Sequence, residues 1–280
     1  MPTTIGTYAT LAALKPRLGL TGTSDDSVLQ MLCDQVNGWI ESKTGRILAP
    51  IPAFATTLAA DASAGATSVS LTSATGLARG DALMFGPVSG THEHGIVAAI
   101  SGTTVTLQAA LANAYSSGAA VERVQLFDGF SAQEGGRLMP ISNGIVAATS
   151  VEVALYTGGP FSLIPGTDWY IRPTPLEREP GWPGTELWMT NIPSGGNTTP
   201  YFPPGFANVR VAGSFGWPAI PEEIASIAQI VTVSAWRNRS AGGGDSVTVG
   251  LDGERTFERF LGYEDKRTLA RFTDKPVAVI

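Results

Sequence analysis

The stretch from Ala53 to Ala120 restricts what this chain can fold into more than any other part, because it is almost free of charge. Only Asp61, Arg79, Asp81 and Glu93 are charged there, and Ala, Gly, Ser and Thr dominate. Two segments within it alternate apolar and polar residues with the period of two that half-buried strands require. These segments are Thr67–Ser73 and Thr103–Ala109. The alternation predicts a small β-module rather than a disordered linker.

Helical periodicity flanks this module on both sides. The preceding helix should end at Gly45, which suits a C-cap, and its apolar face carries Val28, Leu32, Val36, Trp39 and Ile40. The following helix should begin at Pro221, because proline is favoured at the first helical position. Its apolar face carries Ile224, Ile227, Ala228, Val231, Ala235 and Trp236. A shorter helix is expected after Thr10, limited or kinked by Pro16.

Short apolar strands separated by Gly and Pro turns fill the remaining middle of the chain. The candidates are Ser150–Tyr156, Asp168–Pro173, Glu186–Thr190 and Asn208–Trp217. We therefore expect an α+β fold: a small helical bundle core of N- and C-terminal helices, a β-hairpin or meander region, and an inserted small all-β domain. The expected boundaries are 1–52 for the N-terminal helical part, 53–125 for the β-module, 126–217 for the meander, and 218–280 for the long helix and tail. The core would be discontinuous, combining 1–52 with 126–280.

Charge and cysteine content exclude several classes of protein. The chain carries a formal net charge of −6, whereas general nucleic-acid binders are usually basic, because phosphate neutralisation dominates their affinity. Cys33 is the single cysteine, so no internal disulfide can form. No apolar run approaches the roughly 18 residues of a membrane span.

The sequence THEHG, residues 91–95, contains both histidines with a carboxylate between them. Two strand histidines on one face could ligate a metal, but a usable site needs a third ligand and a second shell. The spacing is not that of the metalloprotease motif HExxH, and the chain has no phosphate-binding loop and no G-x-S-x-G motif. We therefore expect that the chain is not an enzyme and that it binds neither a cofactor nor a metal. His92 and His94 are the pair that a metal would use if a ring of subunits brought copies together.

The residues from Asp252 to Lys275 are densely charged with both signs and include regularly spaced apolar side chains. Such a tail can order when it docks onto a partner. The docking candidates are Phe257, Phe260, Lys266, Arg267, Leu269, Arg271 and Phe272.

Three separated blocks resemble the head-to-tail connector, or adaptor, proteins of tailed bacteriophages. Tyr8–Arg46 resembles their N-terminal helical segment, Asn208–Arg239 their closing strand, "FGW…P" turn and long helix, and Gly262–Thr273 their C-terminal tail. Ser162–Pro173 is similar to the β-hairpin before the closing strand. These blocks cover roughly half of the chain, in the family's order. The region Ala53–Ala120 departs from simple adaptors, which lack it.

The resemblance implies a structural virion protein of the phage neck, assembled in the host bacterial cytoplasm. Adaptors form a homo-oligomeric ring, here expected to be dodecameric, beneath the portal protein. The ring joins the capsid to a stopper, head-completion or tail-terminator protein, and DNA passes through its lumen without sequence-specific binding. Membrane contact is not implied. The side chains expected to pack the core or the oligomer are Leu32, Val36, Trp39, Ile40, Trp217, Ile224, Ile227, Val231 and Trp236.

Two other functions compete with the adaptor hypothesis. A β-rich phage structural module that binds carbohydrate or another surface is indicated by the aromatic residues Trp182, Trp188, Tyr201 and Phe202, although core or inter-subunit packing also explains these residues. A metal-dependent enzyme would be built on His92 and His94.

Overall fold

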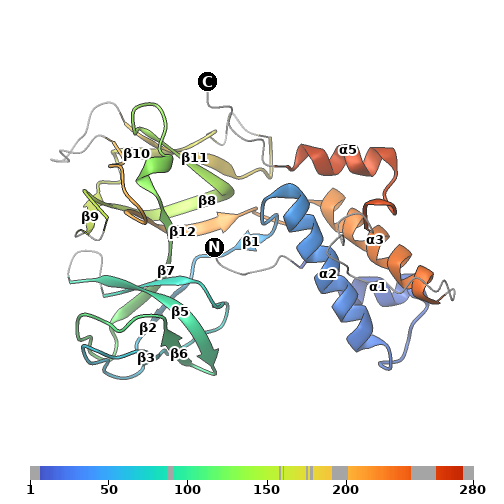
Figure 1. Ribbon diagram of the computed structural model, residues 1–280, viewed down its shortest axis with the longest axis horizontal. Helices are drawn as coiled ribbons and strands as arrows, with labels where there is room; N and C mark the ends of the chain where they lie inside the picture. Colours follow the sequence, from blue (N-terminus) through green and yellow to red (C-terminus); the bar gives the residue numbers. More distant parts are fainter. Residues whose placement is uncertain are drawn as a thin grey trace. The chain divides into compact units, whose positions relative to one another are not determined.

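The computed structural model describes residues 7–86, 91–157, 159, 161–174, 176, 179–190, 201–240 and 257–273 (Figure 1). The chain divides into two compact units. One, the β-rich unit, runs from Ile51 to Phe215. The other, the helical unit, combines the described residues up to Pro50 with those from Gly216 onward.

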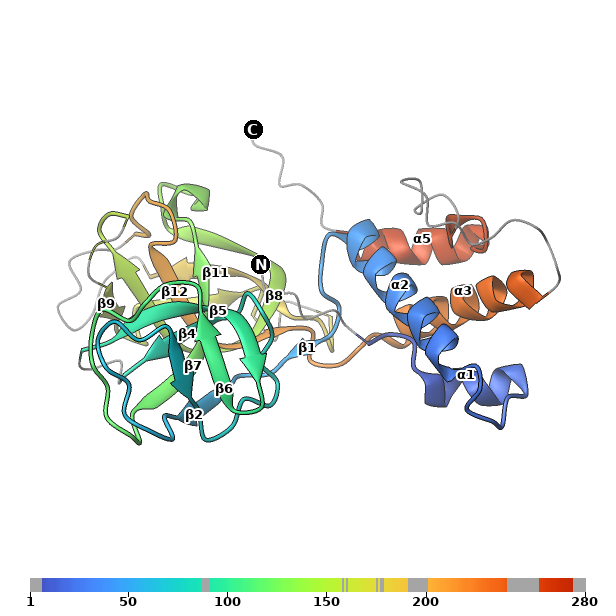
Figure 2. The ribbon, with the colours of Figure 1, turned by 60° about the horizontal axis from the view of Figure 1, so that its bottom comes forward.

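The helical unit is built from four helices in the described part of the chain, and the view in Figure 2 shows them grouped together. They are α1 (Leu11–Leu18), α2 (Asp26–Thr44), α3 (Glu222–Ser240) and α5 (Tyr263–Arg271). The Thr10 side chain caps α1, and Gly45 closes α2 with a positive φ of 67°. α3 contacts each of the other three helices, so segments far apart in the sequence share one core.

The core of the helical unit is formed by the apolar faces that the periodicity predicted. Of the expected packing residues, Trp236 is half-buried. The others are buried: Leu32, Val36, Trp39, Ile40, Trp217, Ile224, Ile227 and Val231. No helix among the described residues is long and apolar enough to cross a membrane.

The β-rich unit contains most of a twelve-stranded sheet formed within the described residues. The first six strands are β1 (Pro50–Ile51), β2 (Ala55–Thr57), β3 (Ser68–Ser70), β4 (Ala82–Phe85), β5 (Glu93–Ser101) and β6 (Thr104–Leu107). The remaining six are β7 (Ala120–Phe127), β8 (Leu138–Ala154), β9 (Phe161–Ile164), β10 (Trp169–Arg172), β11 (Gly184–Met189) and β12 (Val209–Gly216). The main path of the sheet is β10-β11-β8-β12-β7-β4-β5-β6-β3. Its neighbouring strands are antiparallel.

The expectation of a small helical bundle as the core of the fold is wrong. The larger part of the protein is the antiparallel sheet, and the helices form a unit of their own. The long helices give a strong periodic signal in the sequence, whereas strands of three or four residues give a weak one. The strength of the sequence periodicity therefore does not indicate how much of the fold the helices or the strands form.

Residues 53–125 have a hydrophobic cluster of their own, formed by residues between Leu58 and Val121 and including Leu83, Phe85 and Val97. The sheet nevertheless continues beyond this region, because β7 pairs with β4 on one side and with β12 on the other. That residues 53–125 form an inserted domain stays a prediction.

Candidate binding site

The THEHG stretch leads into β5, which begins at Glu93. His94 lies within the strand, paired with Met84 of β4, and His92 immediately precedes the strand. Both imidazoles are half-buried.

Glu93 has a structural role at this point. Its Oε2 accepts a hydrogen bond from the backbone N–H of Ala112 at 2.7 Å, and its Oε1 accepts one from the N–H of Asn113 at 2.8 Å. The carboxylate therefore fastens the loop after β6 to the start of β5. Hydrogen bonds of this charge-assisted kind hold the group in place.

A buried ion pair lies beside His92. Arg210 of β12 and Glu152 of β8 stand directly opposite each other across the two strands, and Arg210 Nε donates to Glu152 Oε2 at 2.7 Å. Both side chains are 1% exposed. His92 Nε2 lies 2.8 Å from the other oxygen of Glu152, so a protonated His92 extends the pair to three charged groups.

The guanidinium of Arg210 is only partly satisfied by protein groups. Its Cζ lies 4.2 Å from the centroid of the Phe161 ring, so the planar cation stacks on the aromatic face. Within the part of the chain that the structure describes, its two terminal nitrogens have no hydrogen-bond partner. Buried charged donors rarely stay unpaired, because desolvation without a partner is costly.

His94 completes the aromatic side of this cluster. Its ring meets Phe161 edge-on, with 5.7 Å between centroids and an interplanar angle of 89°. Burial lowers the pKa of His94, the charge of Arg210 lowers it further, and Glu93 partly offsets the effect. The imidazole of His94 is therefore uncharged at neutral pH.

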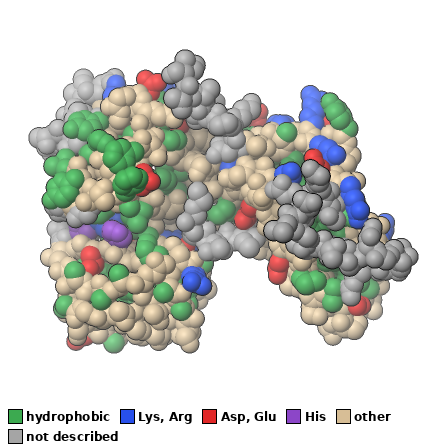
Figure 3. All heavy atoms as spheres, in the orientation of Figure 1, with side chains coloured by type: hydrophobic (Ala, Val, Ile, Leu, Met, Phe, Trp, Pro, Cys, Tyr) green, Lys and Arg blue, Asp and Glu red, His purple; other side chains and the backbone are tan. Residues whose placement is uncertain are grey.

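These side chains line a surface hollow of about 380 Å³ in the β-rich unit. Its wall consists of His92, Glu93, His94, Thr157, Gly159, Phe161, Phe206, Ala207 and Arg210. In Figure 3 the histidines, coloured purple, reach the surface below a group of green apolar side chains. The hollow thus joins apolar and hydrogen-bonding surface, as small-ligand sites do.

The loop that carries Phe206 is fixed at its base by Asn208, which is fully buried. The Asn208 side chain accepts from Gly129 N–H at 2.8 Å and donates to the carbonyls of Ala154 and Pro203. Phe206 itself remains 63% exposed, with its ring 5.0 Å from that of Phe130. The loop therefore presents an aromatic face from a rigid base.

No group of three or more His, Cys, Asp or Glu side chains that could hold a metal ion occurs among the described residues. His92 is directed to Glu152 and His94 to Phe161, so the two imidazoles have different neighbours.

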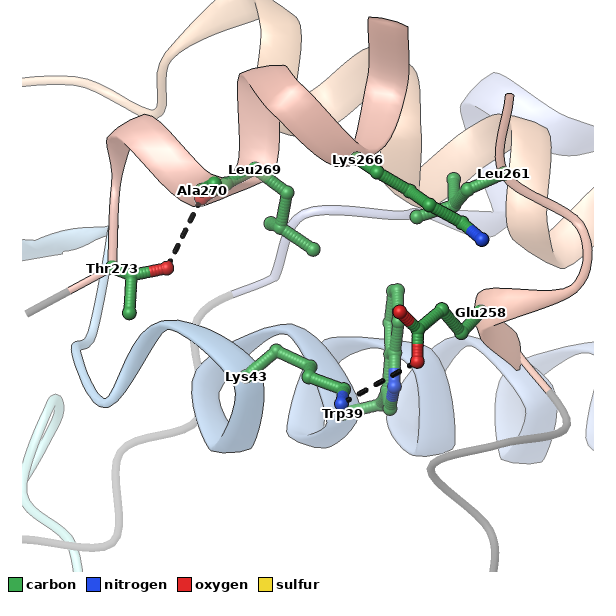
Figure 4. A pocket seen from close by; sticks show the side chains of 8 residues that line it. All are labelled: Trp39, Lys43, Glu258, Leu261, Lys266, Leu269, Ala270 and Thr273. Atoms are coloured by element: carbon green, nitrogen blue, oxygen red, sulfur yellow. Dashed lines mark hydrogen bonds and ion pairs between the residues drawn. The ribbon is translucent and has the colours of Figure 1, made fainter. Parts of the chain in front are cut away.

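A second, smaller hollow of about 140 Å³ lies in the helical unit (Figure 4). It is lined by Trp39, Lys43, Glu258, Leu261, Lys266, Leu269, Ala270 and Thr273. Lys43 Nζ lies 3.6 Å from Glu258 Oε2 across it.

The docking candidates of the tail divide into three groups by their exposure in the structure. Phe257, Leu269 and Phe272 are buried, with Phe257 against Trp39 and Phe272 against Trp217 at centroid distances of 5.9 and 5.3 Å. Phe260 is half-buried. The exposed candidates are Lys266, Arg267 and Arg271. In this chain the apolar members thus pack internally, and the cations reach the surface.

The aromatic residues that indicated carbohydrate binding lie outside the larger hollow. Phe202 is buried, Tyr201 is exposed, and Trp188 donates from Nε1 to Glu186 Oε2 at 2.7 Å. Sequence reasoning missed Glu152, Phe161, Phe206 and Arg210. The one available signal was an arginine between the apolar residues Val209 and Val211 of a buried strand.

No family model matches the chain, and no curated protein does. A solved structure with detectable similarity is the Gp54 tailspike of Acinetobacter baumannii bacteriophage AP22 in complex with A. baumannii capsular saccharide. The match has 23% sequence identity and a TM-score of 0.24, and it covers 27% of this chain and 15% of the tailspike chain. A similarity this limited assigns neither a fold nor a function.

Proposed function

We propose that this chain is a structural protein of a tailed-phage particle and that its β-rich unit binds a carbohydrate. The observation that carries the proposal is the hollow of about 380 Å³ with the exposed ring of Phe206 at its side and Arg210 in its wall, whose two terminal nitrogens have no hydrogen-bond partner among the described residues. The phage context is an inference from the sequence resemblance.

A sugar ring matches the two kinds of surface in the hollow. Its C–H face can pack on an aromatic ring, and its hydroxyl oxygens accept hydrogen bonds from buried donors. Phe206 supplies the exposed aromatic face, and the terminal nitrogens of Arg210 supply the donors. The firmly anchored loop reduces the entropy lost when a ligand orders the site.

A glycan array probed with the full-length protein tests this function, followed by calorimetric titration of any glycan retained. We expect Phe206→Ala to weaken binding by about tenfold, which corresponds to the loss of one aromatic contact. Tyr263→Ala, which removes an aromatic ring that is 80% exposed in the helical unit, is the matched control and should bind as the unaltered protein does. Absence of glycan binding at high protein concentration would refute the proposal.

A second function, that of head-to-tail adaptor, is favoured by the helical unit. The blocks that resemble adaptors lie far apart in the sequence, yet α3 contacts α1, α2 and α5. An adaptor would use this unit to form a ring beneath the portal, and the β-rich unit would then be an added binding module. The two functions are compatible in one virion protein.

Electron microscopy of the protein alone and with a portal protein tests the adaptor function. Rings in either sample would support it, and their absence from both would contradict it. Arg267 is 74% exposed on α5, so we expect Arg267→Glu to reduce co-purification with the portal. Arg17→Glu, a charge reversal at an exposed position on α1, is the matched control.

A further inference from the structure

The balance of charge around the larger hollow determines which sugars it can accept. Arg210 is the buried cation, and Glu152 neutralises it through a 2.7 Å hydrogen bond. Glu93 contributes a carboxylate to the wall, and the lowered pKa of His94 favours the neutral form of that imidazole. His92 Nε2 lies 2.8 Å from Glu152 Oε1 and so faces a carboxylate. The wall therefore holds no excess of positive charge to attract an anion.

The two terminal nitrogens of Arg210, without a hydrogen-bond partner in the part of the chain that the structure describes, nevertheless require acceptors. A guanidinium only donates hydrogen bonds, and its planar fork suits two acceptor atoms placed side by side. Two adjacent sugar hydroxyls provide such a pair without introducing charge. A sugar carboxylate would also fit the fork, but it would lie close to Glu152 and Glu93, and like charges repel strongly where water is excluded.

We propose that the hollow selects an uncharged sugar ring, with the terminal nitrogens of Arg210 donating to two adjacent hydroxyls and Phe206 covering the ring's apolar face. This inference rests on the proposed carbohydrate function and specifies the class of ligand. Both nitrogens are buried, so a ligand reaches them when a side chain in the wall shifts. Satisfying two buried donors then contributes to affinity.

The test compares matched glycans that differ only in charge. Oligomers of neutral hexoses and of the corresponding uronic acids are titrated into the full-length protein at near-neutral pH. We expect the neutral oligomer to bind at least about tenfold more tightly than its uronic acid counterpart. Stronger binding of the uronic acid would overturn this inference and leave carbohydrate binding intact, whereas binding of neither class would overturn both.

Two substitutions examine the mechanism of selection. Glu152→Gln keeps an oxygen that can accept from Arg210 Nε but removes the negative charge beside Arg210. We expect it to shift the preference toward the uronic acid by roughly tenfold, and an unchanged preference would contradict the charge argument.

Phe206→Ala provides a second measurement that does not disturb the buried pair, because its ring is exposed. It should weaken binding of the neutral oligomer, while Tyr263→Ala should not. Unchanged binding in Phe206→Ala would show that the sugar binds elsewhere and would overturn the inference. This measurement remains informative if Glu152→Gln fails to fold.

Discussion

At the scale of single residues, Arg123 is a buried cation that ties together distant segments of the β-rich unit. Its Nη1 donates to Asp81 Oδ2 at 3.3 Å and to the carbonyl of Gly76 at 3.1 Å, and its Nη2 donates to the carbonyl of Pro52. Substitution by methionine would leave the fully buried carboxylate of Asp81 without its cation. We expect Arg123→Met to lower the free energy of unfolding by about 3–5 kcal/mol, measured by chemical denaturation.

The control for this prediction is Arg267→Met, because Arg267 is 74% exposed and lies 4.0 Å from Glu264. Exposed ion pairs contribute little, so its unfolding curve should match that of the unaltered protein. Equal destabilisation by both substitutions would contradict the role assigned to Arg123.

His94 predicts a dependence of stability on pH. Its pKa in the folded protein lies below the usual 6.5. As the pH falls toward and below 6.5, the unfolded chain therefore binds more protons at this position than the folded protein does. The contribution of His94 to the free energy of unfolding is therefore lost as the pH falls from about 6.5 through the folded pKa. His94→Phe keeps an aromatic ring beside Phe161 and removes the titration. Denaturation curves recorded across this pH range should show a smaller fall in the free energy of unfolding for the variant. An equal fall in both proteins would contradict the prediction.

The sequence located half of the residue cluster. The sequence singled out THEHG, and β5 begins within it at Glu93, but the partners of its histidines could not be inferred. Glu152 and Arg210 are 58 residues apart, and neither has a local pattern that indicates the other. Such pairs are set by strand register, which local periodicity does not determine.

At the scale of elements, α5 is anchored in the helical unit. Leu269 and Phe272 are 7% and 3% exposed, and Phe272 packs against Trp217 at 5.3 Å. The sequence hypothesis of a tail that orders on a partner did not include this internal packing. We expect Phe272→Ala to lower the free energy of unfolding by about 3–5 kcal/mol, as for other buried aromatic residues, measured by chemical denaturation.

Tyr263→Ala is the control that distinguishes the loss of buried packing from the loss of an aromatic ring alone. Tyr263 belongs to the same helix but is 80% exposed, so its substitution should leave stability almost unchanged. If Phe272→Ala proved equally harmless, the observed burial of α5 would not hold in solution.

Individual elements were predicted better than their assembly. The predicted strand Thr67–Ser73 contains β3, and Gly45 closes α2 as its sequence context indicated. Local propensity and capping determine such features. The error in fold class arose because pairing between strands such as β7 and β12 links residues 85 or so positions apart, which no local pattern records.

At the scale of the whole molecule, the chain forms two compact units, divided after Pro50 and after Phe215. The change in composition at Ala53 lies close to the first division. The second falls within the predicted strand Asn208–Trp217, where the sequence gives no sign of a boundary. The sequence thus indicates the first division, where the composition changes, but not the second, which lies within a predicted strand.

Two compact units should unfold in separate steps when each is stable by itself. We expect calorimetry of the full-length protein to resolve two transitions. Arg123→Met should lower the temperature of one, because its contacts lie in the β-rich unit. Phe272→Ala should lower that of the other, because Phe272 packs against Trp217 in the helical unit. A single transition shifted by both substitutions would show that the units unfold as one.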